Sequence, residues 1–445
     1  MRGHVAKGRS AARRRRREAP LFVPALLAIA CLATLAFTIP FSGVHIPGSR
    51  RIHALLDRLP QPWKPPRPVY VLPPESEAAP LVIAVAQTGE TPPEAMTVAA
   101  PVASAAEAPA VPAEPVEPSI SPPAPAAAPA ASVRPAPPAF RLEGFRHQWQ
   151  TWNNCGPATI TMATSHFGRP ETQAQAARFL KPNADDKNVG PDELVAYTRS
   201  LGLRADWLVA GDLERLKLLL ANGIPVVAEM WFTPQPNDGM GHYRLLVGYD
   251  DAAGRFYAYD SYSPPGVNVP LPYRAFDADW RVFNRTYIPV YPAERADVVA
   301  AIVGPDADHQ AMYARALAVA QQEAAAQPGD AFAWFNLGTS LTALGRTAEA
   351  VAAFDRARSL RLPWRMLWYQ FAPFEAYLAE GRINDVLALA DANLRQTGDL
   401  EESHYYRGRA LQALGQTAAA RAAFQNAVRV NPRFAPAHHA LASLA

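Results

Sequence analysis

The sequence predicts two folded domains, an α+β domain over residues 141–295 and an all-α repeat solenoid over residues 305–445. Helical patterns followed by alternating strand patterns indicate the first domain. A recurrent spacing of glycine, leucine, alanine and phenylalanine indicates the second. The chain has 445 residues, which is enough for both domains and a long N-terminal extension.

The first 40 residues predict a basic tail followed by a membrane anchor. Residues 1–18 carry eight Arg or Lys and one acid, so the basic composition of the chain reflects this tail. Residues 21–39 contain no charge and are just long enough to span a bilayer as a helix. The preceding run Arg13–Arg17 favours a cytoplasmic N-terminus. We therefore expect a tail at 1–20 and a single-pass anchor at 21–40 in the cytoplasmic membrane, with everything downstream exported.

Two other interpretations of residues 21–39 stay open. A cleavable signal peptide needs a shorter apolar core and small residues at a cleavage site, whereas this stretch continues to Phe41. A lipoprotein signal would use Cys31, which lies mid-stretch without the usual branched residue three positions earlier. Because Cys31 lies inside the apolar segment, Cys155 is left without a disulfide partner on the exported side.

Residues 41–140 predict a Pro/Ala-rich disordered linker. Residues 60–140 contain 22 of the chain's 45 prolines, a composition that cannot form a hydrogen-bonded sheet or pack a core. If flexible, roughly 80 residues would reach about 50 Å on average, so the linker would tether the folded domains. No basic patch with exposed aromatic residues accompanies it, and no nucleic-acid partner is expected.

The α+β domain is predicted to begin with helices and end with strands. Cys155 and Gly156 precede Pro157, which suits the first turn of a helix that ends at Gly168. Further helices are expected at about 172–180, 191–201 and 212–221. Strands are expected at 224–231, 242–249, 255–260 and 285–291, and their order favours antiparallel pairing.

Three polar residues of this domain form a candidate catalytic set. Cys155 lies at the predicted start of a helix, where unpaired backbone N–H groups favour a thiolate. His242 could take the thiol proton, and Asp260 on the next strand could orient the imidazole. Each residue alone has an ordinary structural explanation, but the three together predict a Cys-His-Asp triad.

Whether His242 and Asp260 meet depends on the turn between their strands. Residues 250–254 predict a hairpin turn. With an odd number of loop residues, Asp260 would lie opposite Arg244 and diagonal to His242 on one face of the sheet. An even number without a bulge would turn Asp260 to the other face, and the sequence leaves both arrangements open.

The motifs around these residues resemble the C39-like cysteine peptidase family, which is related to the peptidase domains of bacteriocin-processing ABC exporters. They are Gln150-Thr-Trp-Asn-Asn-Cys155-Gly-Pro, Gly241-His242-Tyr243 and Tyr257-Ala-Tyr-Asp260, in the family's chain order. The resemblance covers about residues 145–292 and implies a papain-like fold that hydrolyses a peptide or protein substrate.

The resemblance also implies a glutamine upstream of Cys155 that binds the oxyanion of the tetrahedral intermediate. Gln150 is the first choice and Gln148 the second. Two departures from the exporters limit what is carried over. No P-loop follows, and Asn154 stands where exporter peptidases commonly have Asp. Cleavage of a double-glycine leader is therefore not implied.

Residues 305–445 predict tetratricopeptide repeats. Counted from Ala331 and from Glu401, Gly, Leu, Ala, Phe and Ala coincide at positions 8, 11, 20, 24 and 27. The expected turns within repeats carry glycine, at Gly345, Gly381 and Gly415. A middle unit at about 367–400 keeps this turn glycine but has Phe374 at position 8 and Asn393 at position 27. We interpret it as a degenerate copy, with a plain helical bundle as the alternative to repeats.

Together these features predict an exported, membrane-tethered cysteine peptidase or related thiol acyl-transfer hydrolase whose repeats bind a protein partner or substrate. One alternative is a catalytically silent peptidase-fold scaffold in an envelope complex, and another is an amidase acting on cell-wall peptides. No cofactor is expected, and no histidine shows metal-ligand spacing. Trp149, Trp152 and Trp231 are expected to pack in the core rather than line a cleft.

Overall fold

The computed structural model describes residues 132–183, 186–233 and 239–444. The predicted tail, anchor and most of the predicted linker lie outside the described residues. Within the described ranges, no helix combines the length and apolar character needed to cross a membrane.

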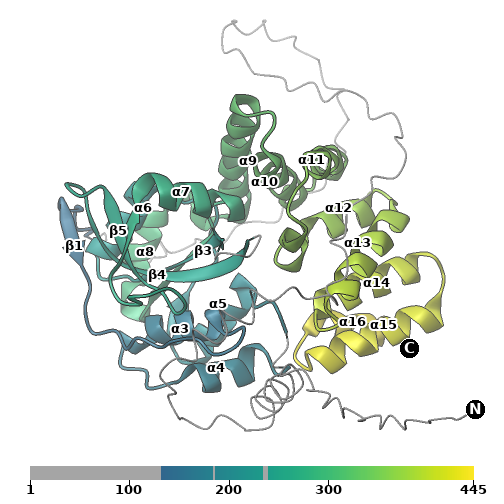
Figure 1. Ribbon diagram of the computed structural model, residues 1–445, viewed down its shortest axis with the longest axis horizontal. Coiled ribbons are helices and arrows are strands. Elements are labelled where there is room, and N and C mark those ends of the chain that lie inside the picture. The colour runs from purple at the N-terminus through teal and green to yellow at the C-terminus, as the bar shows by residue number, and fades with distance from the viewer. Residues whose placement is uncertain (1–131, 184–185, 234–238, 445) are drawn as a thin grey trace, which may run out of the picture. The chain divides into compact units, whose positions relative to one another are not determined.

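The first folded region is built on an antiparallel sheet (Figure 1). In the described ranges the sheet has seven strands in the order β2-β7-β3-β4-β5-β6, and β1 pairs with β4 beside this path. The strands are β1 (Ala139–Arg141), β2 (Arg204–Ala205), β3 (Val226–Phe232), β4 (Met240–Asp250), β5 (Arg255–Tyr259), β6 (Val269–Pro272) and β7 (Tyr287–Tyr291).

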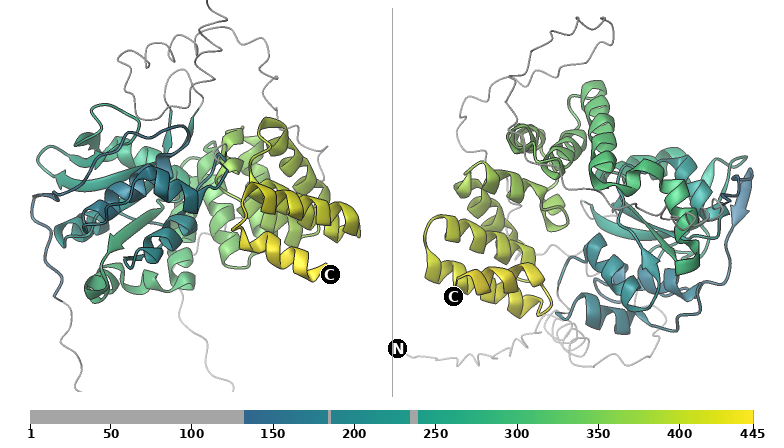
Figure 2. Two further views of the ribbon diagram at one scale, coloured as in Figure 1. Left: turned by 90° about the horizontal axis from the view of Figure 1, so that it is seen from below. Right: turned by 180° about the vertical axis from the view of Figure 1, so that it is seen from behind.

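Helices cover both faces of this sheet (Figure 2). One core packs α3 (Cys155–Ser165), α4 (Gln173–Leu180) and α5 (Pro191–Ser200) against one face. The other core packs α6 (Leu213–Ala221), α7 (Tyr273–Trp280) and α8 (Ala296–Val303) against the opposite face. Short 3-10 helices follow at η1 (Arg281–Phe283), η2 (Ala293–Arg295) and η3 (Gly304–Ala307). Because both faces are covered, β3 and β4 are almost entirely buried.

The elements expected from the sequence are confirmed with small shifts at their ends. The sequence predicts no element between residues 261 and 284, where the structure has β6 and α7. Two of the four residues of β6 are prolines, which remove both the alternation and the backbone donors typical of a strand.

The folded region begins before residue 141. Arg134 exchanges backbone hydrogen bonds with the side chain of Asn222 at 2.8 and 2.9 Å. The Tyr249 hydroxyl donates to the carbonyl of Pro137 at 2.8 Å, and β1 then pairs with the end of β4. Residues 134–140, which the sequence assigns to the linker, are therefore fixed to the domain.

The β4–β5 hairpin combines an even loop with a bulge. Asp250 pairs with Arg255, which leaves four residues in the loop. The register then shifts between Leu246 and Gly248, so that Val247 is the extra residue on β4. Beyond the bulge Leu245 pairs with Tyr259. Past the bulge, the pairing is therefore the one expected for a loop with an odd number of residues. Asp260 comes opposite Arg244 and lies on the same face of the sheet as His242.

The second folded region consists of paired helices, as predicted (Figure 1). They are α9 (His309–Ala326), α10 (Ala331–Ala343), α11 (Thr347–Ser359), α12 (Ala372–Ala379), α13 (Ile383–Gln396), α14 (Glu401–Ala413), α15 (Thr417–Val430) and α16 (Ala435–Ser443). A Cβ at Gly338 would lie 2.6 Å from the Phe354 ring, and one at Gly408 would lie 2.5 Å from Phe424. Glycine at position 8 thus lets the phenylalanine at position 24 approach.

The middle unit departs from this pattern. Residues 344–346, 380–382 and 414–416 connect α10 to α11, α12 to α13 and α14 to α15. The connection from α11 to α12 is longer, spans residues 360–371 and contains η4 (Trp364–Trp368). The two folded regions share two apolar clusters. Trp231 and Phe283 pack with residues of the repeats in one, and Met312, Tyr313 and Ala316 of α9 pack with the first region in the other.

Candidate active site

Cys155 is the first residue of α3 and has a free, half-buried thiol. The preceding Asn154 does not cap the helix, because its side chain donates to the Thr151 hydroxyl instead at 2.8 Å. The first amides of a helix have no partner within it, so positive potential collects there. The helix start therefore favours an anionic sulfur and leaves backbone donors for a ligand.

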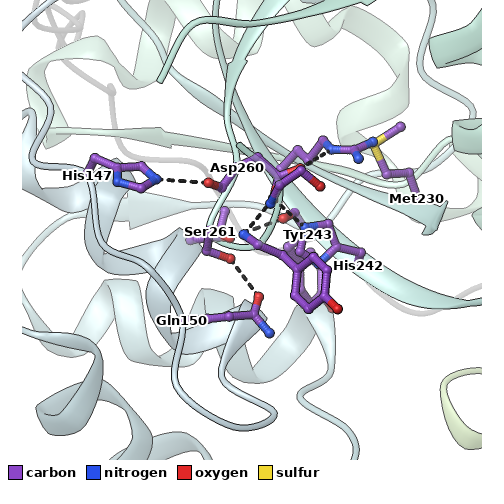
Figure 3. Close-up of polar contacts among 11 residues, drawn as sticks. His147, Gln150, Met230, His242, Tyr243, Asp260 and Ser261 are labelled. Atoms are coloured by element: carbon purple, nitrogen blue, oxygen red, sulfur yellow. Dashed lines mark hydrogen bonds and ion pairs between the residues drawn. The ribbon is translucent and has the colours of Figure 1, made fainter. Parts of the chain in front are cut away.

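His242, near the start of β4, is hydrogen-bonded to Asp260, which directly follows β5 (Figure 3). The distance from Nε2 to Oδ1 is 3.0 Å, and the two side chains are 3% and 0% exposed. The imidazole also lies close enough to the Cys155 thiol for each group to shift the pKa of the other. Since Nε2 contacts Asp260, Nδ1 is the nitrogen left for the thiol. The structure thus brings the three predicted residues together.

Four donors hold the Asp260 carboxylate in place (Figure 3). Oδ1 accepts from His242 and from the backbone amides of Tyr262 and Ser263, at 2.7 and 3.0 Å. Oδ2 accepts from Arg244 Nε at 2.8 Å. Burial alone would raise the pKa of Asp260, but His242 and Arg244 hold that pKa well below its usual range. Asp260 is therefore ionised and fixed in orientation.

The thiol and the imidazole shift each other's pKa in opposite directions. Burial would raise the pKa of Cys155, but the hydrogen bond and positive charge of His242, with help from Lys181, lower it below its ordinary value. Burial would lower the pKa of His242, but Asp260 and Cys155 raise it. Both shifts favour a thiolate–imidazolium pair near neutral pH.

The two glutamines proposed for the oxyanion are used differently. Gln148 donates from Nε2 to the Thr161 hydroxyl at 3.0 Å and accepts the Gln173 amide at 2.9 Å, so it joins α3 to α4. Gln150 is fixed by Ser261, whose hydroxyl donates to Oε1 at 2.8 Å (Figure 3). Its Nε2 makes no hydrogen bond with any described residue. Of the two glutamines, Gln150 is therefore the one whose side-chain N–H groups are available to bind an oxyanion.

The expectation that three tryptophans pack in the core holds for only one of them. Trp231 is buried against Phe283 and Phe332. Trp149 is partly exposed, and Trp152, three residues before Cys155, is 73% exposed. For Trp152 the expectation is wrong, because the loop before α3 turns its indole outward.

Two charged residues near the site escaped the sequence analysis. Arg244 lies two residues after His242 and therefore points to the same face of β4, where it contacts Asp260. Glu229 interrupts the apolar strand β3, is 3% exposed, and has an Oε2 with no partner among the described residues. A charge inside an apolar strand is the signal that identifies both. Within the described ranges, no group of three or more His, Cys, Asp or Glu is arranged to hold a metal.

The family comparison agrees with this geometry. Residues 142–288 match the Peptidase_C39 like family, and residues 333–361 and 401–434 match the tetratricopeptide repeat. The first of these segments is similar to a C39-like peptidase domain. Tetratricopeptide repeats follow it, and the family match covers about a third of the chain. No curated protein matches the sequence.

Solved structures similar to the chain include C39 peptidases and a repeat protein. The peptidase domain of Streptococcus ComA is 14% identical with a TM-score of 0.28, covering 34% of this chain and 99% of its own. Xylellain, a cysteine protease from Xylella fastidiosa, is 14% identical with a TM-score of 0.28, covering 36% and 87%. MamA from Desulfovibrio magneticus RS-1 is 21% identical with a TM-score of 0.27, covering 30% and 74%. Similarities this low carry no argument about activity.

Proposed function

We propose that the chain is a cysteine peptidase in which Cys155 is the nucleophile, His242 the general acid and base, and Asp260 the group that orients and stabilises the imidazolium. The observation that carries this proposal is the hydrogen bond between the His242 imidazole and the buried Asp260 carboxylate, together with the position of that imidazole beside the Cys155 thiol, where each group shifts the pKa of the other. A cysteine kept only for packing needs neither an imidazole beside it nor a second partner that fixes that imidazole.

The reaction follows from the positions of these groups. The Cys155 thiolate attacks the carbonyl carbon of a peptide bond, and the carbonyl oxygen becomes an oxyanion. Gln150 Nε2 and the backbone N–H of Cys155 are the donors for this oxyanion. The imidazolium of His242 protonates the leaving amine, which departs and leaves a thioester. His242 then takes a proton from water, the resulting hydroxide cleaves the thioester, and the free acid is released.

We also propose that residues 21–39 anchor the chain in the cytoplasmic membrane and that its folded part is exported. The support is the uncharged stretch directly after the run Arg13–Arg17. The test is alkaline carbonate extraction of membranes, followed by protease treatment of intact spheroplasts. Release by carbonate would rule out the anchor, and protection of the folded part in spheroplasts would rule out export.

Tetratricopeptide repeats are protein-interaction modules, and we propose that they hold a partner or the substrate here. A groove between α12 and α14 is available for this, and its lining includes Glu375, Leu378, Tyr406 and Arg409. Its mixture of aromatic, apolar and charged groups suits a peptide segment rather than a flat apolar face.

The catalytic proposal is tested by the reactivity of Cys155. The purified full-length chain is treated with iodoacetamide at pH 7, and peptide mapping separates Cys155 from Cys31. We expect rapid labelling of Cys155 that falls by on the order of 10²-fold in His242→Ala. His439→Ala, an exposed histidine of the repeats, is the matched control and should leave the rate unchanged.

Hydrolysis is read from the same protein incubated with a mixture of proteome-derived peptides. New peptide termini should form with the wild type and be absent with Cys155→Ser. Slow labelling that is indifferent to His242 would leave only the scaffold alternative. Fragments released from peptidoglycan, with none from peptides, would support the amidase instead.

A further inference from the structure

The insertion at residues 360–371 (the 360–371 insertion) is a folded part of the repeat region. Its side chains Leu362, Met366 and Leu367 are buried. The rings of Trp364 and Trp368 meet edge to face at 5.0 Å, with the Arg365 guanidinium over both. The insertion therefore has a defined conformation and can place a side chain.

The degenerate positions of the middle repeat hold this insertion. Asn393 stands at position 27, where the regular repeats have Ala357 and Ala427. It is fully buried, and its Nδ2 donates to the carbonyl of Leu367 at 2.7 Å and to the Ser403 hydroxyl at 3.1 Å. A buried amide at this position costs free energy unless it is bonded, and its partner is the insertion. Asn393, which departs from the repeat pattern, thus fixes the 360–371 insertion through Leu367.

The insertion reaches β4 immediately before His242. Arg365 Nη1 donates to the carbonyl of Gly239 at 3.1 Å. The Tyr369 ring lies against Gly241, where an added Cβ would be 3.2 Å from two ring carbons. The Phe283 ring meets the Tyr369 ring edge to face, with centroids 6.0 Å apart, and it also lies 3.2 Å from that Cβ position. The repeat region therefore contacts the backbone of the residue next to His242.

The Tyr369 hydroxyl lies near the Gly241 backbone amide and close enough to Cys155 for the thiol to act on its pKa. Burial and the nearby thiol raise its pKa, so it stays neutral and keeps its proton at working pH. The side chain is only half-buried. None of the hydrogen bonds within the described part of the chain takes up the hydroxyl proton. A neutral donor that adjoins the residue before His242 and lies within electrostatic range of the thiol is suited to bind a substrate oxygen.

We propose that Tyr369, supplied by the repeat region, is a substrate-binding residue of the cysteine site, and that its hydroxyl donates a hydrogen bond to a backbone carbonyl of the peptide bound across Cys155. This inference rests on the proposed peptidase function. It assigns the repeats a direct part in the site in addition to docking, and it makes the peptidase domain incomplete without the 360–371 insertion.

Two thiol-directed probes test this on the full-length chain. Iodoacetamide reports only the thiolate, whereas N-acetyl-Ala-Ala-Ala chloromethyl ketone must also seat its backbone carbonyls before the sulfur displaces chloride. In Tyr369→Phe we expect an unchanged iodoacetamide rate and pH midpoint, and a loss of about 3–10-fold in the second-order rate of the peptidyl probe, the value of one neutral hydrogen bond. Tyr197→Phe, which removes a buried hydroxyl without a partner, should change neither rate.

The outcomes separate this inference from the proposed function. If iodoacetamide labels the wild type in a His242-dependent manner but Tyr369→Phe reacts normally with the peptidyl probe, the catalytic proposal stands and the role of Tyr369 is refuted. Equal slowing of both probes would show that Tyr369 acts only by supporting His242, which also refutes substrate binding. A wild type that reacts with the peptidyl probe no faster than a free thiol refutes both proposals.

Discussion

Two buried carboxylic acids lie on opposite faces of the β3–β4 pair, and their surroundings give them opposite pKa shifts. Asp260, on the face of His242, receives bonds from an imidazole, a guanidinium and two backbone amides, and its pKa is lowered. Glu229 pairs across the strands with Tyr243, so it faces the other way. Its Oε2 has no partner among the described residues, and burial raises its pKa well above the ordinary value.

The comparison shows that partners, rather than burial, decide which acid is charged. The groups that act electrostatically on Glu229 are Cys155 and Asp192, and neither is a cation. An ionised Glu229 would oppose a thiolate on Cys155, whereas an ionised Asp260 stabilises the imidazolium that accompanies that thiolate. The negative charge is thus kept on the side of the sheet where it supports the proposed ion pair.

Asp260→Asn should have the largest effect on reactivity. Asparagine keeps the shape but not the charge, so the pKa of His242 should fall and that of Cys155 should rise. We expect a loss on the order of 10²–10⁴-fold in alkylation of Cys155 at pH 7, with the acid limb of the pH–rate profile moved to higher pH. Iodoacetamide rates from pH 5 to 9 measure both.

The control for Asp260→Asn is Asp206→Asn, because Asp206 is a partly exposed acid that pairs with Arg199 and accepts a hydrogen bond from the Tyr291 hydroxyl, away from the cysteine. Circular dichroism should show that both variants remain folded. An unchanged pH midpoint in Asp260→Asn would mean that the carboxylate only positions the ring, and the charge argument would then be wrong.

Arg244→Met tests the second partner of Asp260. Arg244 and Asp260 are both buried, and removing Arg244 takes away one of the two cationic partners of the carboxylate while His242 and two backbone amides remain. We expect the free energy of unfolding to fall by about 1.5–3 kcal/mol, the value of a hydrogen bond to a charged group, measured by urea denaturation. Arg346→Met removes an exposed pair with Glu349 and should cost no more than about 1 kcal/mol. An equal loss of unfolding free energy in Arg244→Met and Arg346→Met would contradict the expectation that the buried pair contributes more than the exposed one.

The elements and the three central residues could be predicted because their signals are local. A proline and glycine bound α3, alternation marks β4, and the repeat glycines recur at a fixed spacing. The face of Asp260 could not be predicted, since it depends on whether β4 contains a bulge. The bulge at Val247 is a feature of the pairing between β4 and β5, which the alternation within one strand does not reveal.

Residues brought in from distant segments were harder to find. Arg244 and Glu229 could be suspected as charges within apolar strands, but their opposite pKa shifts depend on what lies across each face. Tyr369 follows Cys155 by more than two hundred positions and carries no motif. Its only trace in the sequence is a repeat spacing of 36 instead of 34 residues between Gly345 and Gly381.

Glu229→Gln should have a smaller effect, and one that depends on pH. The folded pKa is raised, so the folded state binds a proton that the unfolded chain releases above about pH 4.5. Stability of the wild type therefore falls as the pH rises from that value toward the folded pKa. Glutamine cannot ionise, so the Tm of the variant should match the wild type at pH 5 and exceed it at pH 8. A lower Tm at both values would show that Glu229 is charged or bonded when folded.

Glu402→Gln should give the smallest effect, at another contact between the peptidase domain and the repeats. Asn188 donates to Glu402 Oε1 at 2.8 Å, Oε2 has no partner among the described residues, and Glu401 and Asp186 lie close by. Burial and these like charges raise the pKa of Glu402, so stability again declines as the pH rises above about 4.5. Glutamine keeps the acceptor for Asn188, and differential scanning fluorimetry should show a small Tm gain at pH 8 and none at pH 5. The exposed control Glu294→Gln should show no change at either pH. An equal gain in Tm at pH 5 and pH 8 would come from packing rather than charge. Glu402 would then differ from Glu229, for which the gain is expected only at the higher pH.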